Sequence, residues 1–86
     1  MYLLILEQRA KKELARIPDR DRVKIERVLE VIVYDPFSGK KLSGELLGQY
    51  AVRAWPYRIV YKIYKNELIV SVVHIGHRKD VYRQFG

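Results

Sequence analysis

Residues 57–75 read YRIVYKIYKNELIVSVVHI, and this stretch decides the fold of the 86-residue chain. Over residues 57–64, tyrosine and isoleucine alternate with arginine, valine and lysine, and a period of two is typical of a β-strand with one buried face. Residues 65–67, Lys-Asn-Glu, predict a hairpin turn. Residues 68–75 are mostly apolar and rich in valine and isoleucine, which favours a strand in a sheet interior. We therefore expect an antiparallel hairpin that Gly76 ends.

Two more strands are expected upstream of this hairpin. Residues 49–55, QYAVRAW, alternate in the same way, and Pro56 closes them at a tight turn. Residues 2–6, YLLIL, form a short apolar run without alternation, which predicts a strand inside the sheet with both faces buried. Residues 37–48 contain three glycines and two serines, and they predict a loop.

The segment between the first strand and the loop has the period of a helical hairpin. Up to residue 17, apolar side chains recur every three or four positions, and Pro18 ends this first helix. Asp19 is the expected N-cap of a second helix, which runs to about Tyr34 before Asp35 and Pro36 terminate it. A connection of one or two residues makes the helices antiparallel, with both apolar stripes turned to a common core.

Together these elements predict a single α+β domain over residues 1–86. It consists of an N-terminal strand, an antiparallel helical hairpin and a three-stranded antiparallel meander, with the strands in one sheet. Both helices are expected on one face, which gives two layers. By alternation, the other face carries basic side chains, at Arg53, Arg58 and Lys62.

The composition limits the classes of function. The chain has no cysteine, which excludes disulfides, thiolate catalysis and sulfur-ligated zinc. His74 and His77 have no pair of carboxylates nearby to complete a metal site, and we expect no cofactor. The N-terminus, MYLLILEQ, is too short for a signal peptide or a membrane span, so we expect a cytoplasmic protein with no membrane contact.

The net charge of +7 is concentrated in the C-terminal half. Residues 1–48 contain ten Lys/Arg against eight Asp/Glu, whereas residues 49–86 contain seven against two. Such a positive field attracts polyanions through counterion release. An ordinary basic surface explains the charge equally well, so charge alone leaves nucleic-acid binding undecided.

One cluster of side chains suits chemistry on RNA. The end of the last strand is expected to bring His77, Arg78 and Tyr82 toward the basic face. Guanidinium groups there can orient a ribose 2′-hydroxyl for in-line attack on a phosphodiester and neutralise the developing charge without a metal. DNA lacks that hydroxyl, so the substrate of such a site is RNA.

The sequence resembles the RelE/ParE toxin superfamily, and the likeness covers essentially the whole chain. Its most specific parts are YRIVY at residues 57–61, IGHR at residues 75–78 and VYR at residues 81–83. The resemblance implies two helices on one side of an antiparallel sheet. RelE-type members cut messenger RNA in the ribosomal A site, whereas ParE-type members share the fold and poison DNA gyrase.

By position, the resemblance implies roles for four residues. Arg53 matches a strand lysine assigned to proton abstraction or phosphate contact, and Arg58 matches an arginine that stabilises transition-state charge. Arg78 matches an arginine that assists the leaving group, and Tyr82 a tyrosine that stacks on a base. We also expect RNA contacts from further basic residues, namely Lys62, Lys79 and Arg83.

The general base is where the chain departs from the family pattern. Arg53 replaces the lysine, Ala51 occupies a second basic position, and a guanidinium does not lose its proton near neutral pH. Histidine is the residue type that titrates in that range, so we predict His77 as the acid or base. His74 shares a face with two valines of its strand by alternation, and it is predicted as a packed, hydrogen-bonded residue.

The leading hypothesis is a toxin of a type II toxin–antitoxin pair. It cleaves messenger RNA on the ribosome by 2′-hydroxyl attack and leaves a 2′,3′-cyclic or 3′-phosphate. A ParE-type gyrase inhibitor without nuclease activity is the alternative, and a third reading is an inactive protein that binds only an antitoxin or RNA. The resemblance implies a cognate RelB-like antitoxin, helical and acidic at its docking surface. Promoter DNA is an expected partner only of the toxin–antitoxin complex.

Overall fold

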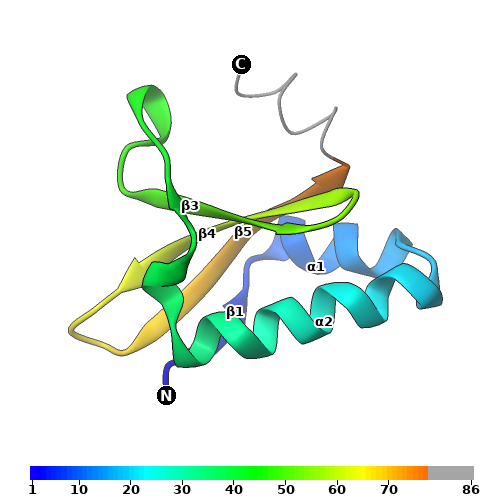
Figure 1. The fold of residues 1–86 in the computed structure, drawn as a ribbon, viewed down its shortest axis with the longest axis horizontal. Helices are drawn as coiled ribbons and strands as arrows, with labels where there is room; N and C mark the ends of the chain where they lie inside the picture. Colours follow the sequence, from blue (N-terminus) through cyan, green and yellow to red (C-terminus); the bar gives the residue numbers. More distant parts are fainter. Residues whose placement is uncertain (78–86) are drawn as a thin grey trace.

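A computed structural model describes residues 1–77, which form one sheet covered by two α-helices (Figure 1). The main elements are β1 (Leu3–Leu6), α1 (Gln8–Arg16), α2 (Asp19–Tyr34), β2 (Lys40–Lys41), β3 (Gln49–Ala54), β4 (Tyr57–Tyr64) and β5 (Ile69–His77). Short 3-10 helices, Pro36–Ser38 and Gly44–Leu46, lie between α2 and β3. The sheet order is β1-β5-β4-β3-β2, with β1 parallel to β5 and the other neighbours antiparallel. This is the predicted α+β fold, with β2 added at one edge.

The two helices lie on one face of the sheet, as predicted (Figure 1). α1 ends where Ile17 adopts extended backbone, and α2 starts directly after Pro18 with Asp19 and Asp21 in its first turn. Asp19 is therefore the first helical residue, one position after the N-cap. Both carboxylates favour the start of the helix because the aligned amides make that end positive.

The core lies between the helices and the sheet. Ile25, Leu29 and Ile32 of α2 and Ala10 of α1 belong to one buried cluster with residues of the sheet. Complete burial of an isoleucine side chain stabilises a fold by about 1.5–3 kcal/mol. The sheet contributes Ile59, Tyr61, Val70, Val72 and Ile75 to the same cluster. Neither helix within residues 1–77 is long and apolar enough to cross a membrane.

β1 is an edge strand and not the predicted interior strand. Among the described strands it pairs with β5, and its residues alternate between the helix side and solvent. Leu3 and Ile5 are 64% and 41% exposed, whereas Leu4 and Leu6 pack against the core. The prediction of burial on both faces is wrong because the helices cover one face only. An apolar run does not reveal what lies over its second face.

β5 continues two residues past its predicted end. Gly76 lies opposite Arg58, and His77 lies opposite Tyr57, in the ladder with β4. The prediction that Gly76 ends the strand is wrong, because a glycine can occupy a strand and the alternation continues through it. His77 therefore lies on the helix side with Tyr57 and not beside Arg58.

A β-bulge shifts the register between β4 and β5. Val60 pairs with His74, but the next residue of β4, Tyr61, pairs with Val72, so Val73 is an extra residue in β5. His74 therefore shares a face with Val60 and not with the core valines of β5, which corrects the assignment from simple alternation. The run VSVVHI does not reveal the bulge, because valine fits a strand in either register.

Tyr61 anchors the connection between α2 and β3 to the core. Its hydroxyl donates a hydrogen bond of 2.7 Å to the carbonyl oxygen of Pro36, and its ring stacks on Tyr50 with centroids 5.7 Å apart. Gly39 passes so close that a Cβ atom there would lie 2.2 Å from the hydroxyl oxygen. Burial raises the pKa of Tyr61 to about 12, because a phenolate at this position would lose its contact with water.

Candidate functional site

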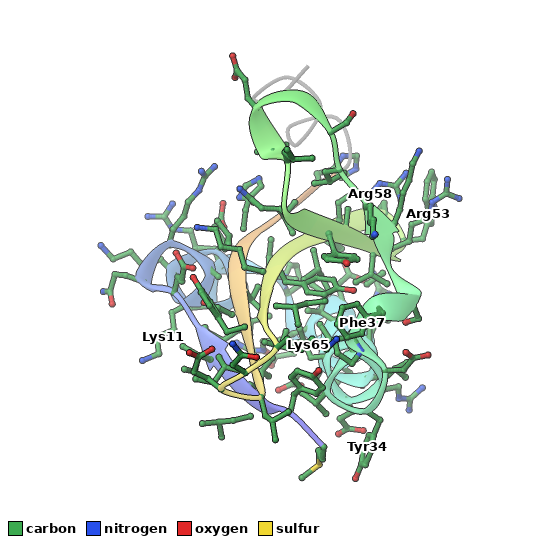
Figure 2. The ribbon with its side chains drawn as sticks, turned by 90° about the vertical axis from the view of Figure 1, so that its left-hand side faces the viewer. Lys11, Tyr34, Phe37, Arg53, Arg58 and Lys65 are labelled. Carbon is green, nitrogen blue, oxygen red and sulfur yellow. The ribbon has the colours of Figure 1, made fainter. Side chains whose placement is uncertain are left out.

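Arg53 and Arg58 form a pair across β3 and β4. Their Cα positions are partners in the antiparallel register, so both side chains leave the same face of the sheet (Figure 2). The neighbours of Arg58 along β4, Tyr57 and Ile59, pack on the helix side, which puts both arginines on the opposite face. Arg53 is exposed, whereas Arg58 is 8% exposed.

The chemistry of this pair favours an anion. Two like charges directly opposite each other in a sheet are destabilising. A phosphate bound to both would remove that repulsion, and the guanidinium fork matches the geometry of phosphate oxygens. On the β5 side, the partner of Arg58 is Gly76, so β5 adds no side chain next to Arg58 in this row.

The rest of the predicted basic face is only partly open. Lys62 is half-buried and pairs with Gln49, and Val60, between Lys62 and Arg58, is 1% exposed. The prediction of a free face is therefore wrong at Val60 and Arg58. Alternation assigns a side chain to a face, but it does not say what covers that face. Arg53 and Lys62 keep surface that a ligand can reach.

His77 does not join the Arg53–Arg58 pair. It pairs with Tyr57, and the two rings meet edge to face with centroids 6.1 Å apart. Successive residues of a strand point to opposite faces, so the sheet separates His77 from Arg58. The Tyr57 hydroxyl donates a 3.1 Å hydrogen bond to Oδ2 of Asp21, and the pKa of Tyr57 is raised by burial and by that carboxylate.

Four predicted site residues, Arg78, Lys79, Tyr82 and Arg83, lie outside the described residues. Their roles in leaving-group stabilisation, base stacking and RNA contact stay predictions. Of the predicted set, the structure brings together Arg53 and Arg58, with Lys62 on the same face.

Glu13 organises the end of β5, a role that was not predicted from the sequence. Its Oε1 accepts a 2.9 Å hydrogen bond from the backbone N–H of Ile75, and its Oε2 lies 2.6 Å from Nδ1 of His74 and 3.3 Å from Nε of Arg9. β1 ends before this part of β5, so the carboxylate occupies the place of a neighbouring strand. In the sequence, only the spacing of four from Arg9 points to a partner, and that spacing is typical of exposed helix surface. His74 is buried and paired, as predicted.

A pocket of about 580 Å³ opens beside this cluster, and we refer to it as the α1–β5 pocket. Its walls include side chains from α1 and from the adjoining ends of β4 and β5, among them Arg9, Glu13, Arg16, Tyr57 and His77. Tyr57 and His77 lie on the helix side of the sheet, so this pocket is separate from the Arg53–Arg58 pair.

The sequence matches a family model described as the ParE toxin of type II toxin-antitoxin system, parDE, over residues 4–82. The chain belongs to the RelE/ParE toxin superfamily. The resemblance to this superfamily is confirmed, and the chain is a toxin of the type II class.

Relatives of this toxin share both its sequence and its fold. Toxin RelG of Mycobacterium tuberculosis is 28% identical over 92 residues, covering 96% of this chain and 98% of RelG. The toxin–antitoxin complex RelBE2 of the same species contains a chain that superposes with a TM-score of 0.82 and 26% identity, over 90% of this toxin and 98% of that chain. The intact Escherichia coli RelBE toxin–antitoxin complex gives a TM-score of 0.79 and 26% identity, over 90% and 96%. The predicted RelE-like fold is confirmed.

Proposed function

We propose that this toxin is a RelE-type endoribonuclease that cleaves messenger RNA on the ribosome. The Arg53–Arg58 pair carries the proposal, because two guanidinium groups on one face suit the phosphate of an RNA backbone. The relatives RelG and the two RelBE complexes bear RelE-type names, which supports the same choice. A ribosomal target implies a cytoplasmic location.

The proposed reaction is an internal transfer at phosphorus that needs no metal. The ribose 2′-oxygen bonds to phosphorus, the bond from phosphorus to the 5′-oxygen of the next nucleotide breaks, and a 2′,3′-cyclic phosphate and a 5′-hydroxyl result. The 2′-hydroxyl gives up one proton and the leaving 5′-oxygen gains one. Arg53 and Arg58 neutralise the charge that grows on the non-bridging oxygens.

Neither arginine is the proton acceptor, because a guanidinium stays protonated at physiological pH. Because His77 lies on the other face of the sheet, it is neither the acid nor the base of the proposed reaction, and the 2′ proton passes to solvent. Arg78 assists the leaving group and Tyr82 stacks on a base in this proposal. Lys62, Lys79 and Arg83 contact the RNA backbone.

Mapping of transcript 5′ ends after induction of the toxin tests the proposal. New ends are expected inside coding sequences, and they should depend on translation because the proposed substrate is messenger RNA on the ribosome. Toxicity and cleavage that survive in an Arg58→Ala, Arg78→Ala double variant would exclude this mechanism.

A ParE-type gyrase inhibitor is the second candidate, and the description of the matched family model favours it. Inhibition of gyrase needs a binding surface and no cleavage chemistry. A supercoiling assay with purified gyrase separates the two functions: relaxed or broken DNA without transcript cleavage indicates the inhibitor. A toxin that shows neither effect but binds an antitoxin or RNA corresponds to the inactive third candidate.

An acidic antitoxin is the proposed partner. The similar RelBE structures are toxin–antitoxin complexes, and a net charge of +7 favours a partner with a negative docking surface. We propose a RelB-like helical protein, with promoter DNA bound only by the complex. Co-purification of the toxin with the product of the adjacent reading frame tests this pairing.

A further inference from the structure

The α1–β5 pocket is not used by the chemistry above, although its walls combine cations with aromatic rings. Arg9, Glu13 and Arg16 follow one another at spacings of four and three, so α1 presents them as one stripe over the end of β5. Tyr57 and His77 contribute rings in edge-to-face contact to the pocket wall.

The charges in this pocket do not cancel. Glu13 is engaged by Arg9, His74 and the N–H of Ile75, so its negative charge is already compensated. Arg16 is exposed in the last turn of α1, and none of the described residues forms an ion pair with it. The pocket therefore offers a guanidinium group to an anionic ligand.

We infer that the α1–β5 pocket binds a nucleotide of single-stranded RNA, with the phosphate on Arg16 and the base against Tyr57 and His77. The volume of about 580 Å³ lies within the range of small-ligand sites. Aromatic rings beside a guanidinium are the combination that holds unpaired nucleotides, through stacking and phosphate contact. An acidic peptide would use the arginine but would gain less from the rings.

Gly76 connects this pocket to the proposed cleavage site. It is the ladder partner of Arg58, and it also lines the pocket. An RNA strand that passes the end of β5 can therefore contact Arg58 on one face of the sheet and His77 on the other. The inference rests on the proposed nuclease function, and it assigns to His77 a nucleotide-binding role in place of an acid–base role.

A titration of the isotope-labelled full chain with adenosine 5′-monophosphate, followed by amide chemical shifts, tests the inference. Shifts are expected at Arg16, Gly76 and His77. Adenosine without the phosphate should bind about tenfold more weakly, and Arg16→Gln should weaken binding of the nucleotide by about the same factor, since a charge-assisted contact is lost. Arg27→Gln changes an exposed arginine of α2 outside the pocket, and it should leave the affinity unchanged.

Three outcomes would overturn the inference. Amide shifts confined to the region of Arg53 and Arg58 would place the nucleotide at that site and not in the pocket. An unchanged affinity in Arg16→Gln would show that Arg16 does not contact the phosphate. A glutamate-rich peptide that binds the pocket more tightly than the nucleotide would make it a protein-docking site. Transcript cleavage is measured in parallel. Nucleotide binding without cleavage would support the binding role of the pocket and exclude the nuclease function. Cleavage without binding at the pocket would exclude only the binding role of the pocket.

Discussion

Arg53 and Arg58 face each other across β3 and β4, and Gly76 of β5 completes the row. Three neighbouring strands thus place two cations together on the side of the sheet that the helices do not cover. In the proposed mechanism, a phosphate contacts both guanidinium groups. That arrangement gives the proposed cleavage a geometry that single substitutions can test.

Arg58→Ala is expected to slow cleavage of messenger RNA about 100-fold or more, because removal of one positioned donor to transition-state charge costs on the order of 10²–10³ in rate. Arg53→Ala should cost about tenfold, since an exposed guanidinium is screened by water. Single-turnover cleavage on isolated ribosomes measures both rates. Arg27→Ala on α2 is the control. Equal rates for the Arg27 and Arg58 variants would show that the Arg53–Arg58 pair takes no part in the reaction.

Glu13→Ala is expected to lower the free energy of unfolding by about 2–4 kcal/mol, because it removes the carboxylate that pairs with His74 and that accepts the hydrogen bond from the N–H of Ile75. Glu13→Gln should cost roughly half as much, since an amide oxygen still accepts the backbone hydrogen bond. Urea unfolding followed by circular dichroism measures both. Glu26→Ala, at an exposed position of α2, should stay within about 0.5 kcal/mol of the parent, and a similar result for Glu13→Ala would refute the role of Glu13.

Gly39→Ala is expected to destabilise the fold by about 1–3 kcal/mol, because the added Cβ would lie 2.2 Å from the hydroxyl oxygen of Tyr61. Tyr61→Phe removes that oxygen and should recover part of the loss in the double variant. Recovery is incomplete because the carbonyl oxygen of Ala51 would also lie 3.1 Å from the new Cβ. A double-mutant cycle in urea measures the coupling, and additive losses would show that the hydroxyl contact is not the cause.

Alkaline pH tests the burial of Tyr61. Its pKa is raised from 10.0 to about 12 in the folded protein, so the unfolded chain releases the phenol proton first. The stabilising contribution of the protonated Tyr61 phenol is constant below pH 10. It is lost between pH 10 and 12, at up to about 1.4 kcal/mol per pH unit. Urea unfolding at a series of pH values measures how the free energy of unfolding depends on pH. In Tyr61→Phe this dependence should be smaller by the amount that corresponds to the release of one proton on unfolding. The same slope in both proteins would mean that Tyr61 is not the group that titrates.

The sequence predicted the elements whose pattern is strong. Strand β4 and helix α2 were predicted from their periods, because one face of each is apolar and the other polar. The predicted bounds of β4 are the observed ones, and α2 ends at Tyr34 as predicted but starts at Asp19, the residue predicted as its N-cap. The register of β5 against β4 could not be predicted from the sequence. The extra residue Val73 and the continued strand at Gly76 decide which face His77 occupies, and neither changes the local composition.

The sequence predicted which basic side chains share a face at the candidate site, but it did not predict which residues surround them. Alternation alone put Arg53 and Arg58 on one face, as the register confirms. The burial of Arg58 and the contact of Glu13 with His74 depend on which segments meet in three dimensions. A single sequence carries no signal for such contacts between residues 61 positions apart, as Glu13 and His74 are.

Mapping of transcript 5′ ends after induced expression is the sharpest test of whether this toxin cuts messenger RNA. Arg58→Ala serves as the matched variant, with circular dichroism to show that its fold persists. New 5′-hydroxyl ends are expected within translated sequences for the wild-type protein, and very few for the variant. Growth arrest by the wild-type protein with unchanged transcript ends, accompanied by relaxed or broken DNA, would contradict the nuclease function.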